Sequence, residues 1–227
     1  MILERTVPFG RSLDEYIKIF KLDSNDLGSK ILSVADGPAS FNAELSTQGG
    51  DVTSVDPIYA FDEKQIETQF YSVLDNIIEQ VKATPDDWTW SYHKSAEDLK
   101  SSRINVTKSF VKHFEEFKNT DRYIIGELPS LLFKANEFNL ALCSHFLFLY
   151  SDHFNYEFHL LSILEMLRVS KEVRIFPLMT LMLQKSPYVD QIIKDLTSKG
   201  YEVNISKSDY ELQKGGNEMM VIKSKQK

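Results

Sequence analysis

The stretch KILSVADGPASFNAELSTQGGDVTSVDP, from Lys30 to Pro57, decides the fold of this chain. It begins with a short apolar run, which is typical of a strand buried in a parallel sheet. A turn of small residues follows at 36–40, and a helix-like segment from Phe41 to Gln48 is closed by two glycines. A second strand, Val52 to Val55, ends on Asp56. The stretch is therefore predicted to form one βαβ unit, with its turn facing a ligand at the helix N-terminus.

Asp56 lies nineteen positions after Gly37 in this unit. That is close to the ~20 residues at which a carboxylate binds ribose hydroxyls in such units. A plain turn-forming role before a proline is the alternative for Asp56.

The same stretch resembles motif I and the acidic loop of class I S-adenosylmethionine-dependent methyltransferases, whose motif reads roughly D-x-G-x-G-x-G. Aligned on Gly37 and the proline after it, Ser33 takes the place of the first acid. Ala35 and Ala39 replace two glycines, and Asp36 adds a carboxylate inside the turn. Alanine permits close backbone approach but adopts a positive φ only at a cost. Taken alone, the stretch also fits an ordinary strand-turn-helix of another α/β protein.

Length and composition indicate one globular α/β domain over residues 1–227. The formal net charge is −7 and no run rich in lysine or arginine appears, which argues against a nucleic-acid partner. The longest apolar run is too short to span a bilayer, and the N-terminus lacks the apolar core of a secretory signal. A cytoplasmic protein without a membrane partner is expected. The single cysteine, Cys143, lies in an apolar run and is expected to be buried and inert.

Apolar periodicity predicts the other elements of the domain. An N-terminal helical segment is expected at about 11–28, and a long amphipathic helix at 62–82. Further strands are expected at 123–125, 138–143 and 173–176, further helices at 154–169 and 189–198, and two β-like runs after residue 201. Alternating strands and helices predict a doubly wound, mostly parallel sheet.

The two final runs surround the turn Gly215-Gly216-Asn217, which is typical of a hairpin. An antiparallel seventh strand resembles the class I methyltransferase fold, and we therefore predict a seven-stranded sheet whose last strand is antiparallel. A nicotinamide-binding domain would more often continue with a crossover helix.

Residues 84–121 form a predicted helical insertion. Trp88 and Trp90 lie in a polar stretch there, and a further helix is marked by phenylalanines at positions 110, 114 and 117. A brace or a contact between two copies of the chain is the plain interpretation, and a lid over the site stays open as the other. A homo-oligomer formed through this insertion is one expectation.

The resemblance implies S-adenosyl-L-methionine as cofactor and assigns residues to it. The turn Asp36-Gly37-Pro38-Ala39 would pack under the methionine part, and Asp56 would accept from both ribose hydroxyls. Ile58 would flank the adenine, with Glu127 and Leu128 at its edge. Ser144, at the end of the fourth strand, completes the cofactor set. For Ile58 and Leu128 a plain core role is equally compatible.

The acceptor is expected at the end of the fourth strand, where ligands collect in open α/β sheets. His145 is the candidate base, and a structural hydrogen-bonding role is its alternative. Phe146 and Tyr150 are the candidate acceptor-binding residues, because aromatic side chains can wall a dry pocket. No spacing of histidines indicates a metal site. The Asn/Asp-Pro-Pro signature of amino-methyltransferases is absent, which argues against adenine or protein-amide nitrogens as acceptors; a small-molecule acceptor is expected.

Three functions are compatible with these residues. A methyltransferase acting on a small molecule is the leading hypothesis. A non-catalytic methyltransferase-like binding or scaffold protein, whose altered motif I no longer holds cofactor, is the second. A nicotinamide-dependent α/β enzyme is the third.

Overall fold

The computed structural model describes residue 3 and residues 6–224. The described strands form one seven-stranded sheet in the order β3-β2-β1-β4-β5-β7-β6. They are β1 (Lys30–Val34), β2 (Asp51–Val55), β3 (Tyr123–Ile124), β4 (Phe138–Ser144), β5 (Ser170–Phe176), β6 (Tyr201–Lys207) and β7 (Glu218–Ser224). The helices are α1 (Leu13–Phe20), α2 (Ser24–Leu27), α3 (Phe41–Thr47), α4 (Glu63–Ala83), α5 (Ala96–Phe117), α6 (Tyr156–Val169) and α7 (Val189–Ser198), with 3-10 turns η1 (Pro57–Ala60) and η2 (Pro85–Asp87). The predicted α/β class and element order are confirmed.

The sheet is parallel from β3 to β5 and becomes antiparallel at β7. β7 is inserted between β5 and β6, so that Met220 pairs with Ile175 on one side and Ile205 on the other. The chain returns from β6 to β7 through a turn in which Gly215 has a φ of +81°. The prediction of an antiparallel last strand is confirmed.

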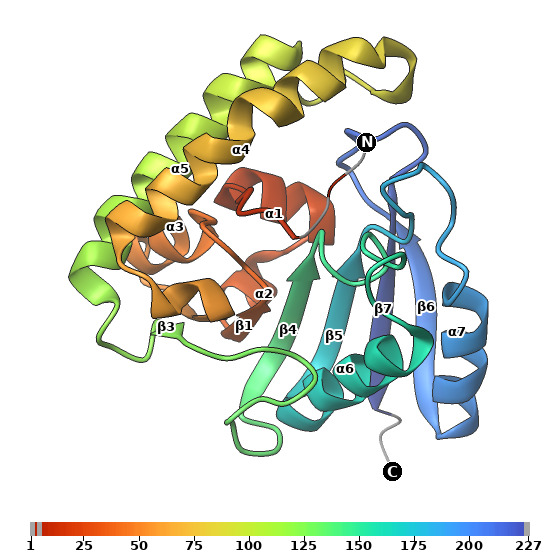
Figure 1. Ribbon diagram of the computed structural model, residues 1–227. Coiled ribbons are helices and arrows are strands. Elements are labelled where there is room, and N and C mark those ends of the chain that lie inside the picture. The colour runs from red at the N-terminus through yellow and green to blue at the C-terminus, as the bar shows by residue number, and fades with distance from the viewer. Residues whose placement is uncertain (1–2, 4–5, 225–227) are drawn as a thin grey trace.

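Helices cover both faces of the sheet (Figure 1). Side chains along a strand alternate between faces, so Leu140 and Leu142 pack with α1, α3 and α4 while Ala141 and Cys143 pack with α6 and α7. Both faces of β4 are therefore buried, which explains its nearly continuous apolar sequence. Cys143 is buried, as expected.

The N-terminal segment forms two helices, where the sequence predicted a single one at about 11–28. A capping box between Ser12 and Glu15 starts α1. Lys21 then adopts a left-handed conformation that ends α1, and the side chain of Asp23 caps α2. Local side-chain capping thus breaks a pattern that apolar periodicity alone leaves continuous.

The 84–121 insertion braces other parts of the same chain. Its helix α5 runs alongside α4 (Figure 1) and begins at Ala96, earlier than its phenylalanines alone indicate. The segment before it lies against the C-terminal loop, where the Thr89 N–H donates to the Leu212 carbonyl at 2.8 Å. The Tyr92 hydroxyl donates to Asp14 at 2.7 Å, which ties the segment to α1 as well. The expected oligomer contact through this insertion stays a prediction.

None of the helices within residues 6–224 combines the length and hydropathy that a membrane-spanning segment needs.

Candidate functional site

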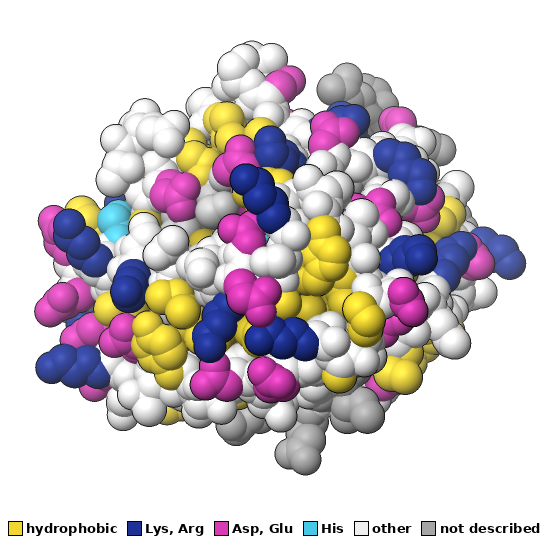
Figure 2. Space-filling view, turned by 90° about the horizontal axis from the view of Figure 1, so that it is seen from above, with side chains coloured by type: hydrophobic (Ala, Val, Ile, Leu, Met, Phe, Trp, Pro, Cys, Tyr) yellow, Lys and Arg dark blue, Asp and Glu magenta, His cyan; other side chains and the backbone are white. Residues whose placement is uncertain are grey.

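A cavity of about 430 Å³ lies at the carboxyl edge of the sheet. The strand order reverses between β1 and β4, because the chain builds outward from β1 in one direction and from β4 in the other. Such a reversal leaves a crevice where open α/β sheets bind ligands. Residues from the ends of β1, β2, β4 and β5 line this cavity together with the N-terminal segment. Figure 2 views the molecule from above, and shows apolar side chains gathered between charged ones on this face.

The Asp36 carboxylate lies in a buried network of hydroxyl groups. It accepts hydrogen bonds from Ser33 at 2.7 Å, from Ser54 at 2.5 Å and from the hydroxyl of Tyr16. Burial raises the pKa of Asp36, although the three hydroxyl groups act in the opposite direction. The Ser33 hydroxyl thus hydrogen-bonds the carboxylate that Asp36 brings into the turn.

The backbone of the turn faces the cavity. A side chain added at Gly37, whose φ is +55°, would meet nothing within 4 Å, so open space lies above this residue. Ala35 adopts a left-handed conformation, with a φ of +53°. Such a conformation costs a non-glycine residue about 1–3 kcal/mol. The neighbouring strand holds it in place, because the Ala35 N–H donates to the Val55 carbonyl at 2.9 Å.

Pro38 and Ala39 are not among the residues that line the cavity. They lie instead under the N-terminal segment, where a Cβ added at Gly10 would come within 2.2 Å of the Pro38 carbonyl oxygen. Only glycine permits this approach. The contact holds the segment against the turn, and the Ser40 N–H strengthens it by donating to the Arg11 carbonyl at 3.0 Å.

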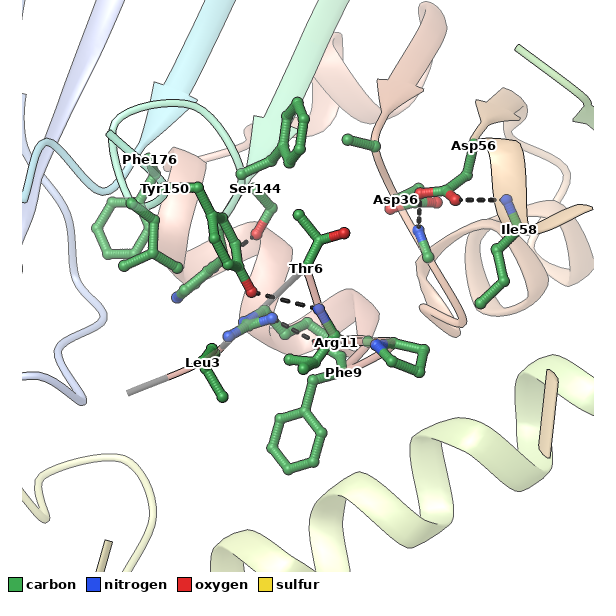
Figure 3. Close-up of a pocket in the computed structure, with 18 of the residues that line it drawn as sticks. Leu3, Thr6, Phe9, Arg11, Asp36, Asp56, Ile58, Ser144, Tyr150 and Phe176 are labelled. Carbon is green, nitrogen blue, oxygen red and sulfur yellow. Dashed lines mark hydrogen bonds between the residues drawn. The ribbon is translucent and has the colours of Figure 1, made fainter. Parts of the chain in front are cut away.

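Asp56 joins the ends of β1 and β2. One carboxylate oxygen accepts from the Gly37 N–H at 2.9 Å, and the other accepts from the Ile58 N–H at 2.8 Å (Figure 3). Burial raises the pKa of Asp56 to about 6, with the two backbone hydrogen bonds acting against that rise. Each carboxylate oxygen can accept more than one hydrogen bond, and each accepts one from the backbone here. Asp56 can therefore accept further hydrogen bonds from a ligand in the cavity that it lines.

The other predicted cofactor residues lie around the same cavity. Ile58 follows Asp56, and Glu127 and Leu128 follow β3. Leu128 is buried, Ile58 is partly exposed and Glu127 is exposed. Ser144 ends β4 on the opposite side of the strand-order reversal and also lines the cavity.

His145 lines the cavity directly after β4, in a left-handed conformation with a φ of +55°. The imidazole Nδ1 of His145 lies 2.9 Å from the Ser144 hydroxyl. The backbone N–H of His145 donates to the Phe176 carbonyl at 2.6 Å. Burial lowers the pKa of His145 well below its usual range, and the nearby Arg11 and Arg103 lower it further. The imidazole is therefore neutral at physiological pH, with its ring edge against the ring of Phe176.

Aromatic side chains form the wall next to His145. Phe146 and Tyr150 lie in this wall, as the sequence indicated, together with Phe154 and Phe158, whose rings stack at 4.4 Å. The Tyr150 hydroxyl accepts a hydrogen bond from the Val7 N–H at 3.4 Å. This contact joins the aromatic wall to the N-terminal segment.

Sequence reasoning missed a buried charged cluster beside the cavity. Arg103 donates two hydrogen bonds to Glu15, at 2.7 and 2.6 Å, and both side chains are almost fully buried. Tyr210 and His93 also contact this carboxylate. The signal was present in the sequence, because Arg103 occupies the apolar stripe of α5 and Glu15 lies on the buried side of α1. A charge on an apolar stripe indicates a buried partner elsewhere in the chain.

Arg11, which also lines the cavity, was missed because the segment before α1 carries no periodic signal. Among the described residues, no group of three or more histidine, cysteine or acidic side chains is arranged to hold a metal ion.

The reversal of strand order at the cavity and the antiparallel β7 define the class I methyltransferase fold. A comparison with family models found none that matches. The chain belongs to the same family as the uncharacterized protein MJ0045 of Methanocaldococcus jannaschii, to which it is 37% identical over 222 residues, 97% of each chain.

Solved structures of similar arrangement include several S-adenosylmethionine-dependent methyltransferases. One is the magnesium protoporphyrin IX methyltransferase of Synechocystis PCC 6803, solved with S-adenosylmethionine bound: 11% identity, 93% of this chain and 77% of that one, TM-score 0.48. Another is a TehB-like methyltransferase of Corynebacterium glutamicum: 16% identity, 88% of this chain and 81% of that one, TM-score 0.44.

Proposed function

We propose that the protein is an S-adenosylmethionine-dependent methyltransferase acting on a small-molecule acceptor. One observation carries the proposal: Asp56, at the end of β2, lines the cavity at the strand-order reversal and keeps acceptor capacity there. A carboxylate in this position suits a ligand that presents two neighbouring hydroxyl groups, as a ribose does.

The residues around Asp56 fit such a cofactor. The open space above Gly37 leaves room for a ligand to lie against the backbone of the turn. Ile58 and Leu128 provide apolar surface on the far side of Asp56, which suits an adenine ring. The alanines at positions 35 and 39 do not block the site, because Ala35 adopts the required left-handed conformation and Ala39 is buried beneath Gly10.

When bound, the cofactor would supply a methyl group on a sulfonium, whose transfer needs no protonation of the leaving group. The chain's own contribution is to position the acceptor and to exclude water. The aromatic wall at Phe146 and Tyr150 would do both.

His145 would accept a proton from the acceptor at its imidazole. Its lowered pKa makes it a weak base. It therefore suits an acceptor that gives up its proton easily.

A non-catalytic, methyltransferase-like binding protein is the competing function, motivated by the departures of motif I at Ser33, Ala35 and Ala39. A nicotinamide-dependent enzyme is disfavoured, because the sheet ends on the antiparallel β7 instead of continuing with a crossover helix.

Calorimetric titration with S-adenosylhomocysteine tests the proposal. The wild type should bind it, and Asp56→Ala should bind at least about tenfold more weakly, since a hydrogen bond to a charged group is worth roughly 1.5–3 kcal/mol. Asp51→Ala is the matched control, because Asp51 is exposed at the opposite end of the same strand. No binding by the wild type would favour the non-catalytic protein, and equal affinity in wild type and Asp56→Ala would refute the ribose role.

A further inference from the structure

The two ends of the cavity carry opposite charge. Asp36, Asp56 and Ile58 lie together at one end, and Arg11 lies at the other, below Tyr150 and Phe176 (Figure 3). The chain as a whole is acidic, with a net charge of −7. A cationic end of a cavity in such a protein calls for a specific explanation.

Both the backbone and the side chain of Arg11 are anchored. The preceding Gly10 packs on the Pro38–Ala39 peptide, and the following Ser12 caps α1. The Arg11 Nη1 donates to the Phe9 carbonyl at 2.7 Å, which fixes the plane of the guanidinium. The group is thus held in one position beside the cavity.

The carboxylate nearest to this end of the cavity, that of Glu15, is paired with Arg103. Both oxygens of Glu15 accept from Arg103, and they also receive the Ser12 N–H and the Tyr210 hydroxyl. Among the described residues Arg11 forms no ion pair, and its Nε is buried without a hydrogen-bond partner. Arg11 therefore has no carboxylate partner of its own among the described residues, and one positive charge at this end stays uncompensated.

An uncompensated cation in a partly buried site is unfavourable. Consistent with this, burial lowers the pKa of Arg11, and the neighbouring Arg103 lowers it further. A carboxylate or other anion that entered the cavity would offset this cost and would form charge-assisted hydrogen bonds with the guanidinium.

We propose that Arg11 binds the anionic group of the methyl acceptor, and that the acceptor is a small organic anion with an aromatic or other flat apolar body. The apolar body would pack among Phe146, Tyr150 and Phe176, which all line the cavity. Tyr150 and Phe176 lie on the same side of it as Arg11 (Figure 3), and the ring centroid of Phe146 is 6.3 Å from that of Tyr150. The identification of this anion as a methyl acceptor rests on the proposed methyltransferase function. The anion site itself does not depend on that function.

The position of Arg11 in the cavity favours the acceptor, and not the cofactor, as the molecule that carries the anionic group. Arg11 is close enough to His145 and Tyr150 to shift the pKa of each, and both belong to the β4 end of the cavity. Asp56, the carboxylate suited to the ribose, lies at the opposite end (Figure 3).

Binding of benzoate and of benzamide to the full-length protein, measured by NMR titration with and without S-adenosylhomocysteine, tests the inference. The two probes share an aromatic body and differ in charge. The wild type should bind benzoate at least about tenfold more tightly than benzamide, since hydrogen bonds with an ionised partner are roughly twice as strong as neutral ones. Arg11→Met should lose that preference while keeping its affinity for S-adenosylhomocysteine. Arg122→Met, which removes an arginine bonded to Ser46 outside the cavity, should keep both.

Two results would overturn the inference. One is equal binding of benzoate and benzamide by the wild type, a comparison that stands even if Arg11→Met fails to fold. The other is an Arg11→Met variant that binds S-adenosylhomocysteine much more weakly but binds 5′-methylthioadenosine, which lacks the carboxylate, as the wild type does. In that case Arg11 serves the cofactor.

Failure of the proposed function has a different signature. If the wild type does not bind S-adenosylhomocysteine but prefers benzoate through Arg11, the anion site is supported and the methyltransferase function is refuted. If the wild type binds S-adenosylhomocysteine but shows no preference for benzoate over benzamide, the methyltransferase function is supported and the anion site is refuted.

Discussion

The backbone N–H of Gly37 donates a 2.9 Å hydrogen bond to the carboxylate of Asp56, and so joins the turn after β1 to the end of β2. This contact sets the orientation of the residue on which the proposed cofactor site depends. Asp56 is partly buried there, and burial raises its pKa to about 6, although the Gly37 hydrogen bond acts against that rise.

Binding of S-adenosylhomocysteine should depend on pH through Asp56. The ionised carboxylate accepts ribose hydroxyls, so affinity should fall about tenfold per pH unit below pH 6. Asp56→Asn should bind weakly and without this dependence. Calorimetry between pH 5 and 8 measures both, and a wild-type affinity that is flat across this range would contradict the assignment.

Asp56 should also affect the stability of the free protein, with the opposite pH direction. Its pKa is raised in the folded state, so the folded chain binds more protons than the unfolded chain between about pH 4 and 6. The free energy of unfolding contributed by this residue therefore falls as pH rises through that window. Chemical denaturation of wild type and Asp56→Asn should show the difference, and parallel pH profiles would count against a buried Asp56.

His145 should stay neutral across the physiological range. Below its usual pKa near 6.5 the unfolded imidazole gains a proton that the folded one does not, so this residue makes folding stability fall as pH falls. NMR of the imidazole should show no titration between pH 6 and 8. His145→Gln should lose about 1–3 kcal/mol if the Ser144 contact is its main role, and should lower turnover about 10²–10⁴-fold if it is the base.

Breaking the buried ion pair of Glu15 and Arg103 should destabilise the fold strongly. Arg103→Met leaves a buried, unpaired carboxylate and should cost about 3–5 kcal/mol of unfolding free energy. The double variant Glu15→Met with Arg103→Met should cost less, because neither charge remains. Denaturant titration measures this, and removing the exposed pair of Lys185 and Asp190 should cost no more than about 1 kcal/mol. A double variant less stable than Arg103→Met would show that the remaining contacts of Glu15 matter more than its charge.

Gly10→Ala should separate the N-terminal segment from the turn after β1. The new Cβ would lie within 2.2 Å of the Pro38 carbonyl oxygen, so one of the two backbones must move. We expect a loss of about 1–3 kcal/mol in stability, the cost of overpacking, together with weaker binding of S-adenosylhomocysteine. Gly49→Ala is the control, because that glycine has a positive φ but open space around it, so strain there should leave ligand binding unchanged. Unchanged binding in Gly10→Ala would show that the segment does not support the site.

Local patterns in the sequence determined most of the fold. The apolar run at 31–35 and the turn after it predicted the first βαβ unit, and the Gly215-Gly216 turn predicted the antiparallel last strand. Asp36, Gly37, Asp56, Ile58, Glu127, Leu128, Ser144, His145, Phe146 and Tyr150 were expected near the ligand, and all line one cavity. This could be predicted because strand ends on one sheet edge converge whatever the details of packing.

Only the tertiary structure decided which charged side chains of the site have partners. The carboxylate of Asp36 was expected beside the cofactor, but it lies in a network with Tyr16, a residue from another helix. Arg11 is uncompensated because Arg103, some ninety positions away, takes both oxygens of Glu15. These outcomes depend on which distant side chains meet. Periodicity within one segment can show that a charged side chain is buried, but it does not show which distant residue that side chain meets. The sequence by itself therefore determined where the cavity is, and long-range packing decided which charge faces it.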